Sequence, residues 1–178
     1  MKTYDSEIEP TKELARIKIQ RKPGVLNPIS PNIYMTVDDE DNIIFGYSKD
    51  YELQIFNPEG DLIKKIMREY DPVEVTEEEK EEATQGISSQ IKVEFPKYHP
   101  PFLRFVHDEK GRLYVQSYEK GDGYNVYYHD FFDRDGRYIA KVQLRQFPVI
   151  FRNGKLYSLE EDEDGYQYIK RYKVTWKY

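Results

Sequence analysis

The chain has 178 residues, of which 33 are acidic and 27 basic, with a formal net charge of -6. Its length suits one domain with a sizeable core, and the absence of cysteine excludes disulfides, thiol catalysis and cysteine-ligated metals. The acidic balance argues against a nucleic-acid-binding surface, and we find neither a membrane-spanning run nor a secretory signal, so the chain as written is expected to be cytoplasmic.

The N-terminal part predicts short strands. Imperfect apolar alternation indicates a first strand at residues 13–20, which has no preceding partner in the sequence. Four strands follow between residues 32 and 68, separated by turns rich in Asp, Asn, Pro and Gly. Strands of this length joined by tight turns predict an antiparallel meander.

Residues 69–101 interrupt the strand pattern. Thr76 followed by three glutamates is a capping box, which predicts a short helix to about Thr84 that Gly86 ends. Residues 95–102 contain three prolines and cannot be helical. We expect an extended lid that leads into a strand at 102–106.

Two further units follow the insert. Residues 102–145 contain four strands, with two turns that each run from Asp to Gly, at 108–111 and 133–136. Residues 148–176 contain only three strands, and we expect the strand at 13–20 to lie beside residues 166–176 as the missing fourth.

The units repeat one another. Asn42-Ile43-Ile44-Phe45 aligns with Gly111-Arg112-Leu113-Tyr114, and a third copy of this motif begins at Asn153. Four-stranded repeats of about 40 to 45 residues are typical of β-propeller blades. The predicted fold is therefore all-β, a single domain over 1–178 with about three blades (32–68, 102–145, 148–176) and one short helix in the insert at 69–101.

Two pairs of segments carry a family resemblance: residues 37–44 with 55–60, and residues 108–115 with 132–136. In them the chain resembles the six-bladed β-propellers of the NHL-repeat type and related bacterial propeller proteins of unknown role. The resemblance covers residues 13–176 and implies a binding platform, a sensor domain or, occasionally, a lyase. Three blades are half of six, so the chain is expected to be a fragment, a half that pairs with another chain, or a degenerate relative. A fragment of a secreted parent would be periplasmic or extracellular.

Metal and cofactor chemistry is not expected. The chain has three histidines, and His107 precedes a turn while His129 lies within a strand, so packing or surface roles are favoured over metal ligation. Residues 160–165 have acids at alternate positions, as a calcium loop would, but its twelfth position is Arg171 rather than glutamate. A solvated acidic turn is the better interpretation, and we identify no catalytic residue.

The candidate ligand-binding residues lie on one predicted rim. In a propeller, the loops between blades share a rim with the loops after each second strand, where ligands usually enter. The candidates are Tyr98, His99 and Arg104 near the end of the insert, with Tyr47, Tyr118 and Glu160 from the neighbouring strands. The alternative is that residues 96–102 merely seal a gap between blades.

The preferred hypothesis is a non-enzymatic propeller module that binds a protein, peptide or glycan on this rim. The alternatives are a lyase or hydrolase half-site completed by a partner chain, and a structural repeat protein without a ligand. Three blades would leave two apolar faces exposed. We therefore expect a homodimer that completes a six-bladed ring, the missing half of a longer protein, or instability in isolation.

Overall fold

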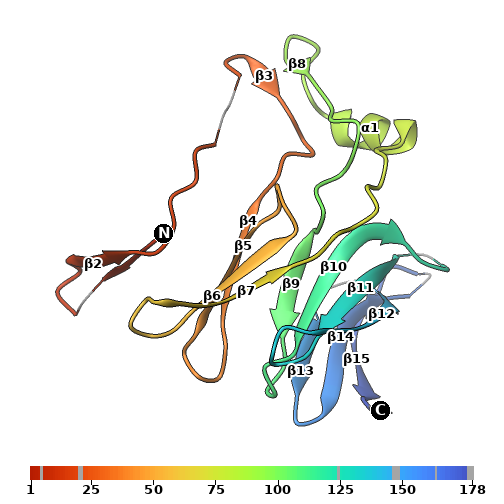
Figure 1. Cartoon of the computed structure of the whole chain (residues 1–178). Helices are drawn as coiled ribbons and strands as arrows, with labels where there is room; N and C mark the ends of the chain where they lie inside the picture. Colours follow the sequence, from red (N-terminus) through yellow and green to blue (C-terminus); the bar gives the residue numbers. More distant parts are fainter. Residues whose placement is uncertain (5, 20–21, 124, 146–148, 163, 176–178) are drawn as a thin grey trace.

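The computed structural model describes residues 1–4, 6–19, 22–123, 125–145, 149–162 and 164–175. This part of the chain contains fifteen strands and one helix, so the all-β prediction is confirmed (Figure 1). Three antiparallel sheets follow one another along the chain, and we call them the first, second and third sheets. None of the described helices is long and apolar enough to cross a membrane.

The first sheet has the order β4 (Ile33–Val37), β5 (Ile43–Tyr47), β6 (Glu52–Phe56) and β7 (Leu62–Met67). Its turns form because side chains accept hydrogen bonds from the backbone of the turn itself. The Asp38 carboxylate accepts from the amides of Glu40 and Asn42, each at 2.9 Å, and the Asn57 carbonyl accepts from the amide of Asp61 at 2.7 Å. These local bonds explain why the four strands could be predicted.

The second sheet has the order β9 (Arg104–His107), β10 (Leu113–Lys120), β11 (Val126–Phe132) and β12 (Tyr138–Arg145). Asp108 and Asp133 make the same turn bonds, to the amides of Arg112 at 3.0 Å and Arg137 at 2.8 Å. The third sheet contains β13 (Val149–Arg152), β14 (Lys155–Glu161) and β15 (Gln167–Lys173). It has three strands in the described residues.

The N-terminal strand differs from the prediction. β1 (Lys2–Tyr4) and β2 (Pro10–Glu13) form a hairpin, and residues 14–19 form no strand. The prediction that residues 13–20 complete the third sheet is therefore wrong for the part described. The apolar residues of this segment lie on the first sheet instead, where Leu14 packs against Gly60, and Ala15 and Ile17 face Phe45. Figure 1 shows the hairpin on the side of the molecule away from the third sheet.

The helix of the insert matches its prediction, whereas the strand expected at 102–106 is β9, Arg104–His107. Helix α1 (Glu77–Thr84) begins with the expected capping box, in which Thr76 Oγ1 accepts from the Glu79 amide at 3.2 Å and Glu79 accepts from the Thr76 amide at 3.0 Å. The helix stops before Gly86, whose φ is +78°. Residues 95–103 are not helical, as the prolines require, and they include bends at Lys97, Pro101 and Leu103 and a bridge from Tyr98 to Glu74. A short parallel pair that we did not predict, β3 (Val25–Leu26) with β8 (Lys92–Val93), closes the end of the insert.

The core lies between the sheets. Successive side chains of a strand point to opposite faces of its sheet, and the first and second sheets pack face to face through their apolar side chains. This cluster contains Ile44, Leu53, Ile55 and Ile66 from the first sheet, Phe105, Leu113, Val115 and Phe132 from the second, and Tyr51 and Phe102 from the connections. A second cluster joins Tyr114 and Phe131 of the second sheet to Phe151 and Leu156 of the third.

The first strands of the sheets lie near one another. Both β4 and β13 are neighbours of β9. The described residues form a stack of three sheets and no closed ring of sheets, so one face of the first sheet and one face of the third have no sheet packed on them.

Candidate ligand-binding site

The insert, the helix and the second sheet meet at His99. The ring of this buried histidine stacks on Tyr118 with centroids 4.2 Å apart and 15° between the planes. Its Nε2 forms a hydrogen bond with Glu79 Oε2 at 3.0 Å, and its backbone amide donates to Val73 O at 2.8 Å. Three segments far apart in sequence are therefore joined at one predicted site residue.

Glu79 carries a negative charge into this junction. Burial raises the pKa of Glu79, but hydrogen bonds from the Thr76 backbone, His99 and Lys120 outweigh it and lower the pKa to about 2. Lys120 Nζ lies 3.2 Å from Glu79 Oε1. The carboxylate is ionised at neutral pH and links α1 to the end of β10.

Arg104 lies on the same sheet and is half-buried. Its Nε donates to Gln116 Oε1 at 2.9 Å across the β9–β10 pair. Burial lowers the pKa of Arg104, and the nearby hydroxyls of Tyr34 and Tyr127 act in the opposite direction. Arg104 is thus held by the sheet rather than extended into solvent.

The remaining predicted residues are more dispersed. Tyr98 is exposed, with Lys97 Nζ 4.8 Å from its ring centroid. Glu160 is buried within the third sheet, where its carboxylate accepts a hydrogen bond from the Tyr172 hydroxyl. Tyr47 lines a separate groove on the first sheet. The structure brings His99 and Tyr118 into contact, with Tyr98 next in sequence, and leaves Tyr47 outside this cluster.

A polar pocket beside Tyr118 was missed in the sequence. It has a volume of about 240 Å³ and lies between the first and second sheets, under the insert. Its lining includes Arg68, Tyr70 and Asp71 after β7, Pro100 and Pro101 of the insert, and Ser117, Tyr118, Glu119, Asp130 and Lys141 of the second sheet. Charges of both signs and three tyrosine rings, Tyr51 among them, surround the space.

The floor of this pocket is a buried carboxylate. Asp130 accepts a hydrogen bond from the Tyr51 hydroxyl at 2.8 Å and forms an ion pair with Arg68. The Arg68 guanidinium also lies 4.2 Å from the ring centroid of Tyr138. Burial raises the pKa of Tyr51, so its hydroxyl remains a donor. The available sequence signal was a charged residue at an inward position of an aromatic strand, Asp130 in β11.

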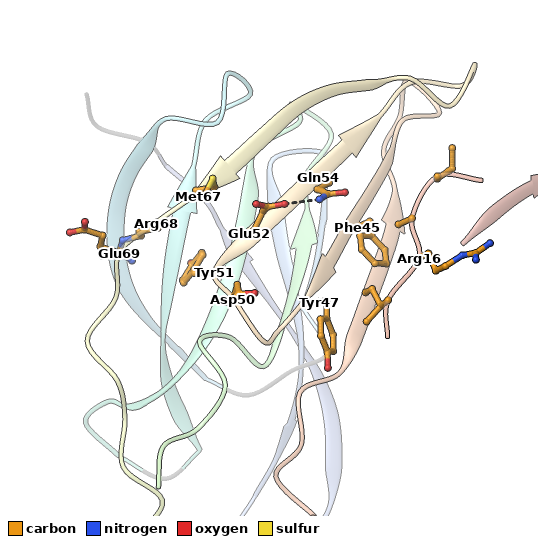
Figure 2. Close-up of a pocket in the computed structure, with 13 residues that line it drawn as sticks. Arg16, Phe45, Tyr47, Asp50, Tyr51, Glu52, Gln54, Met67, Arg68 and Glu69 are labelled. Atoms are coloured by element: carbon orange, nitrogen blue, oxygen red, sulfur yellow. Dashed lines mark hydrogen bonds between the residues drawn. The ribbon is translucent and has the colours of Figure 1, made fainter. Parts of the chain in front are cut away.

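A larger groove lies on the outer face of the first sheet. Its volume is about 740 Å³, and Figure 2 shows Phe45 and Tyr47 between the sheet and the N-terminal segment that carries Arg16. Gln54 Nε2 donates to Glu52 Oε1 at 2.6 Å on the same surface. This groove is the part of the sheet face that the N-terminal segment fails to fill.

The histidines and the acidic turn have structural partners. His107 Nδ1 lies 3.2 Å from the carbonyl oxygen of Asp108, and His129 Nδ1 lies 3.1 Å from that of Tyr127. Asp162 accepts from the amide of Tyr166 at 2.9 Å, which forms the turn that joins β14 to β15. The described residues contain no group of three or more His, Asp or Glu side chains placed to hold a metal ion.

Comparison with known proteins does not assign the chain. No family model matches it, and no curated protein is significantly similar to it.

Proposed function

We propose that the chain is a non-enzymatic binding module, built as half of a six-bladed β-propeller of the NHL type, that takes a protein, peptide or glycan ligand on the rim formed by the insert. Sheets that stack face to face in chain order, with their first strands adjacent, support the propeller arrangement. Three such sheets would supply half of the ring, and a homodimer would supply all six.

The observation that carries the ligand site is the pocket between the first two sheets. Tyr118 lies on its wall and also supports His99, so the insert and the pocket share one side chain. Tyrosine rings beside charged groups of both signs suit a polar ligand that also offers apolar surface, such as a peptide segment or a sugar. Tyr98 is exposed on the insert, next in sequence to His99.

The test selects ligands for the wild-type chain from a random peptide library and a glycan array, then measures their affinities by calorimetry. We expect Tyr70→Ala, which removes a partly exposed ring of the pocket, and Tyr98→Ala to weaken binding by about tenfold or more. Lys110→Ala is the control, because Lys110 lies in the turn at the opposite end of β10. Selected ligands that bind both tyrosine variants as well as the wild type would contradict the proposal.

A further inference from the structure

The two end faces of the stack carry exposed apolar side chains. Strand pairing places Ile33, Met35 and Val37 of β4 on the outer face of the first sheet, next to Tyr47, Phe45 and Ile43 of β5. Met35 is 59% exposed, and Met67 on the same face is 70% exposed. On the outer face of the third sheet, Ile150 is 62% and Ile169 74% exposed, with Leu159 paired to Ile169. Contiguous apolar surface of this kind marks an interaction site.

We propose that these two faces dock on each other between two copies of this chain, so that the first sheet of each copy packs on the third sheet of the other. This proposal rests on the proposed propeller arrangement and identifies a second copy of the chain as the partner. Two such contacts close a ring of six sheets, with two-fold symmetry and a different surface on each side of every contact.

The chain already contains this contact twice. The face of the first sheet that bears Ile44 packs on the face of the second that bears Leu113, and the opposite face of the second, which bears Tyr114, packs on the third at Leu156. In each contact, therefore, the earlier sheet in the chain contributes one face, which we call its successor-side face. The later sheet contributes its opposite face, which we call its predecessor-side face.

The first sheet has a free predecessor-side face, and the third sheet has a free successor-side face. The turns make Ile43 the equivalent of Leu113, since Asp38 and Asp108 bind the amide four residues later in the same way. Ile43 therefore lies on the free, predecessor-side face of the first sheet, while the third sheet leaves its successor-side face free. A first sheet placed after the third repeats the contact seen twice within the chain, which favours a second copy over an unrelated partner.

Charge also favours the pairing. The outer face of the third sheet carries Lys155, Arg171 and Lys173 against one acid, Glu161. The N-terminal hairpin and the β6–β7 turn border the outer face of the first sheet and touch each other through Lys12 and Asp61. Their described residues carry more acids than bases, namely Glu7, Glu9, Glu13, Glu59 and Asp61 against Lys2 and Lys12. Opposite charges at the edges of the two faces orient the encounter.

The first sheet also has room for the partner. The N-terminal segment covers Phe45 but leaves cavities of about 740 and 530 Å³ along the outer face, the second of them bordered by Ile33 and Met35. The face is thus incompletely covered by its own chain.

Light scattering after size-exclusion chromatography at micromolar concentration tests the proposal on the full chain. We expect the wild type at about twice the 21.4 kDa of one chain. Met35→Glu, on the first sheet, and Ile169→Glu, on the third, should each give monomers, whereas the matched control Ile91→Glu, 46% exposed on the insert, should remain dimeric. Circular dichroism would establish that each variant is folded.

Mixing the two monomeric variants is the decisive step. The Met35→Glu chain keeps an unchanged third-sheet face, and the Ile169→Glu chain keeps an unchanged first-sheet face. These two faces can form one intact contact, so a dimer should reappear. A wild-type monomer, a species larger than a dimer, or a mixture that stays monomeric would overturn the proposal. Intact dimers that select no rim ligand would instead count against the proposed function alone.

Discussion

Phe102 should contribute more to stability than other residues near the insert. Its side chain is fully buried, and its ring centroid lies 5.9 Å from Tyr34, 5.8 Å from Tyr51 and 6.1 Å from Phe105. Replacing a buried Phe by Ala removes its transfer energy and leaves a cavity, together about 3–5 kcal/mol, and aromatic pairs of this geometry add to the cost. We expect Phe102→Ala to lower the free energy of unfolding by about 4 kcal/mol, a large fraction of the roughly 5–15 kcal/mol of a typical domain.

Urea unfolding followed by circular dichroism at one fixed protein concentration measures this loss, since self-association would make stability depend on concentration. Ile91→Ala is the control, because this residue is exposed, and its effect should stay within about 0.5 kcal/mol. A loss below about 1 kcal/mol for Phe102→Ala would refute the packing of the insert between the first two sheets.

Three further changes test the core in other ways. Gly46→Ala should cost about 1–3 kcal/mol in the same urea assay, because the added Cβ would lie 2.7 Å from Leu53 Cδ2, and an unchanged midpoint would contradict this packing. Burial lowers the pKa of His129 to about 4, so the unfolded chain takes up a proton first as pH falls below about 6.5. The contribution of the neutral ring to the free energy of unfolding is therefore complete above that pH and is lost as the pH falls toward 4. The loss should be about 2 kcal/mol between pH 7 and 5, and the slope of the free energy of unfolding against pH should be smaller in His129→Gln. Arg68→Met leaves the buried Asp130 without its ion pair and should destabilise by about 3–5 kcal/mol, whereas a loss under 1 kcal/mol would show that the carboxylate is solvated.

The correct sequence predictions concern features set by neighbouring residues. The turn aspartates and the Thr76 capping box bind amides two to four residues away, so their chemistry is complete within a short window. The strands between these turns follow, because a period of two assigns alternate residues to opposite faces.

The repeat alignment, in contrast, was wrong by one residue. Matching letters paired Asn42 with Gly111, but the turn bonds pair Asp38 with Asp108 and therefore Asn42 with Arg112. A shift of one residue exchanges the two faces of a strand, so the alignment by residue identity would assign Ile44 to the wrong face of the sheet. Hydrogen-bonding roles identify equivalent positions here more reliably than residue identity does.

The other failures concern contacts between distant segments. The strand expected at 13–20 followed from imperfect apolar alternation, and its place beside the third sheet followed from counting strands. Residues 14–17 instead lie on the free face of the first sheet, which only the tertiary structure determines. The pocket was missed for the same reason, because Arg68 and Asp130 come from different sheets. His99 and Tyr118, both predicted as ligand-binding residues, lie in contact, but their stacking shows that His99 supports the insert and is buried.

Polar contacts between the sheets bear on the docking proposal. Apolar faces alone tolerate sliding, but Asp130 joins the first and second sheets at one end, and Lys64 Nζ donates to Arg134 O at 2.6 Å at the other. Glu109 accepts from the Gly154 amide at 2.9 Å and so ties the second sheet to the third. Bonds at both ends fix the relative positions of the first two sheets, and the bond from Glu109 fixes the third sheet relative to the second. The outer faces are therefore held in a set orientation before any partner arrives, which lowers the entropic cost of docking.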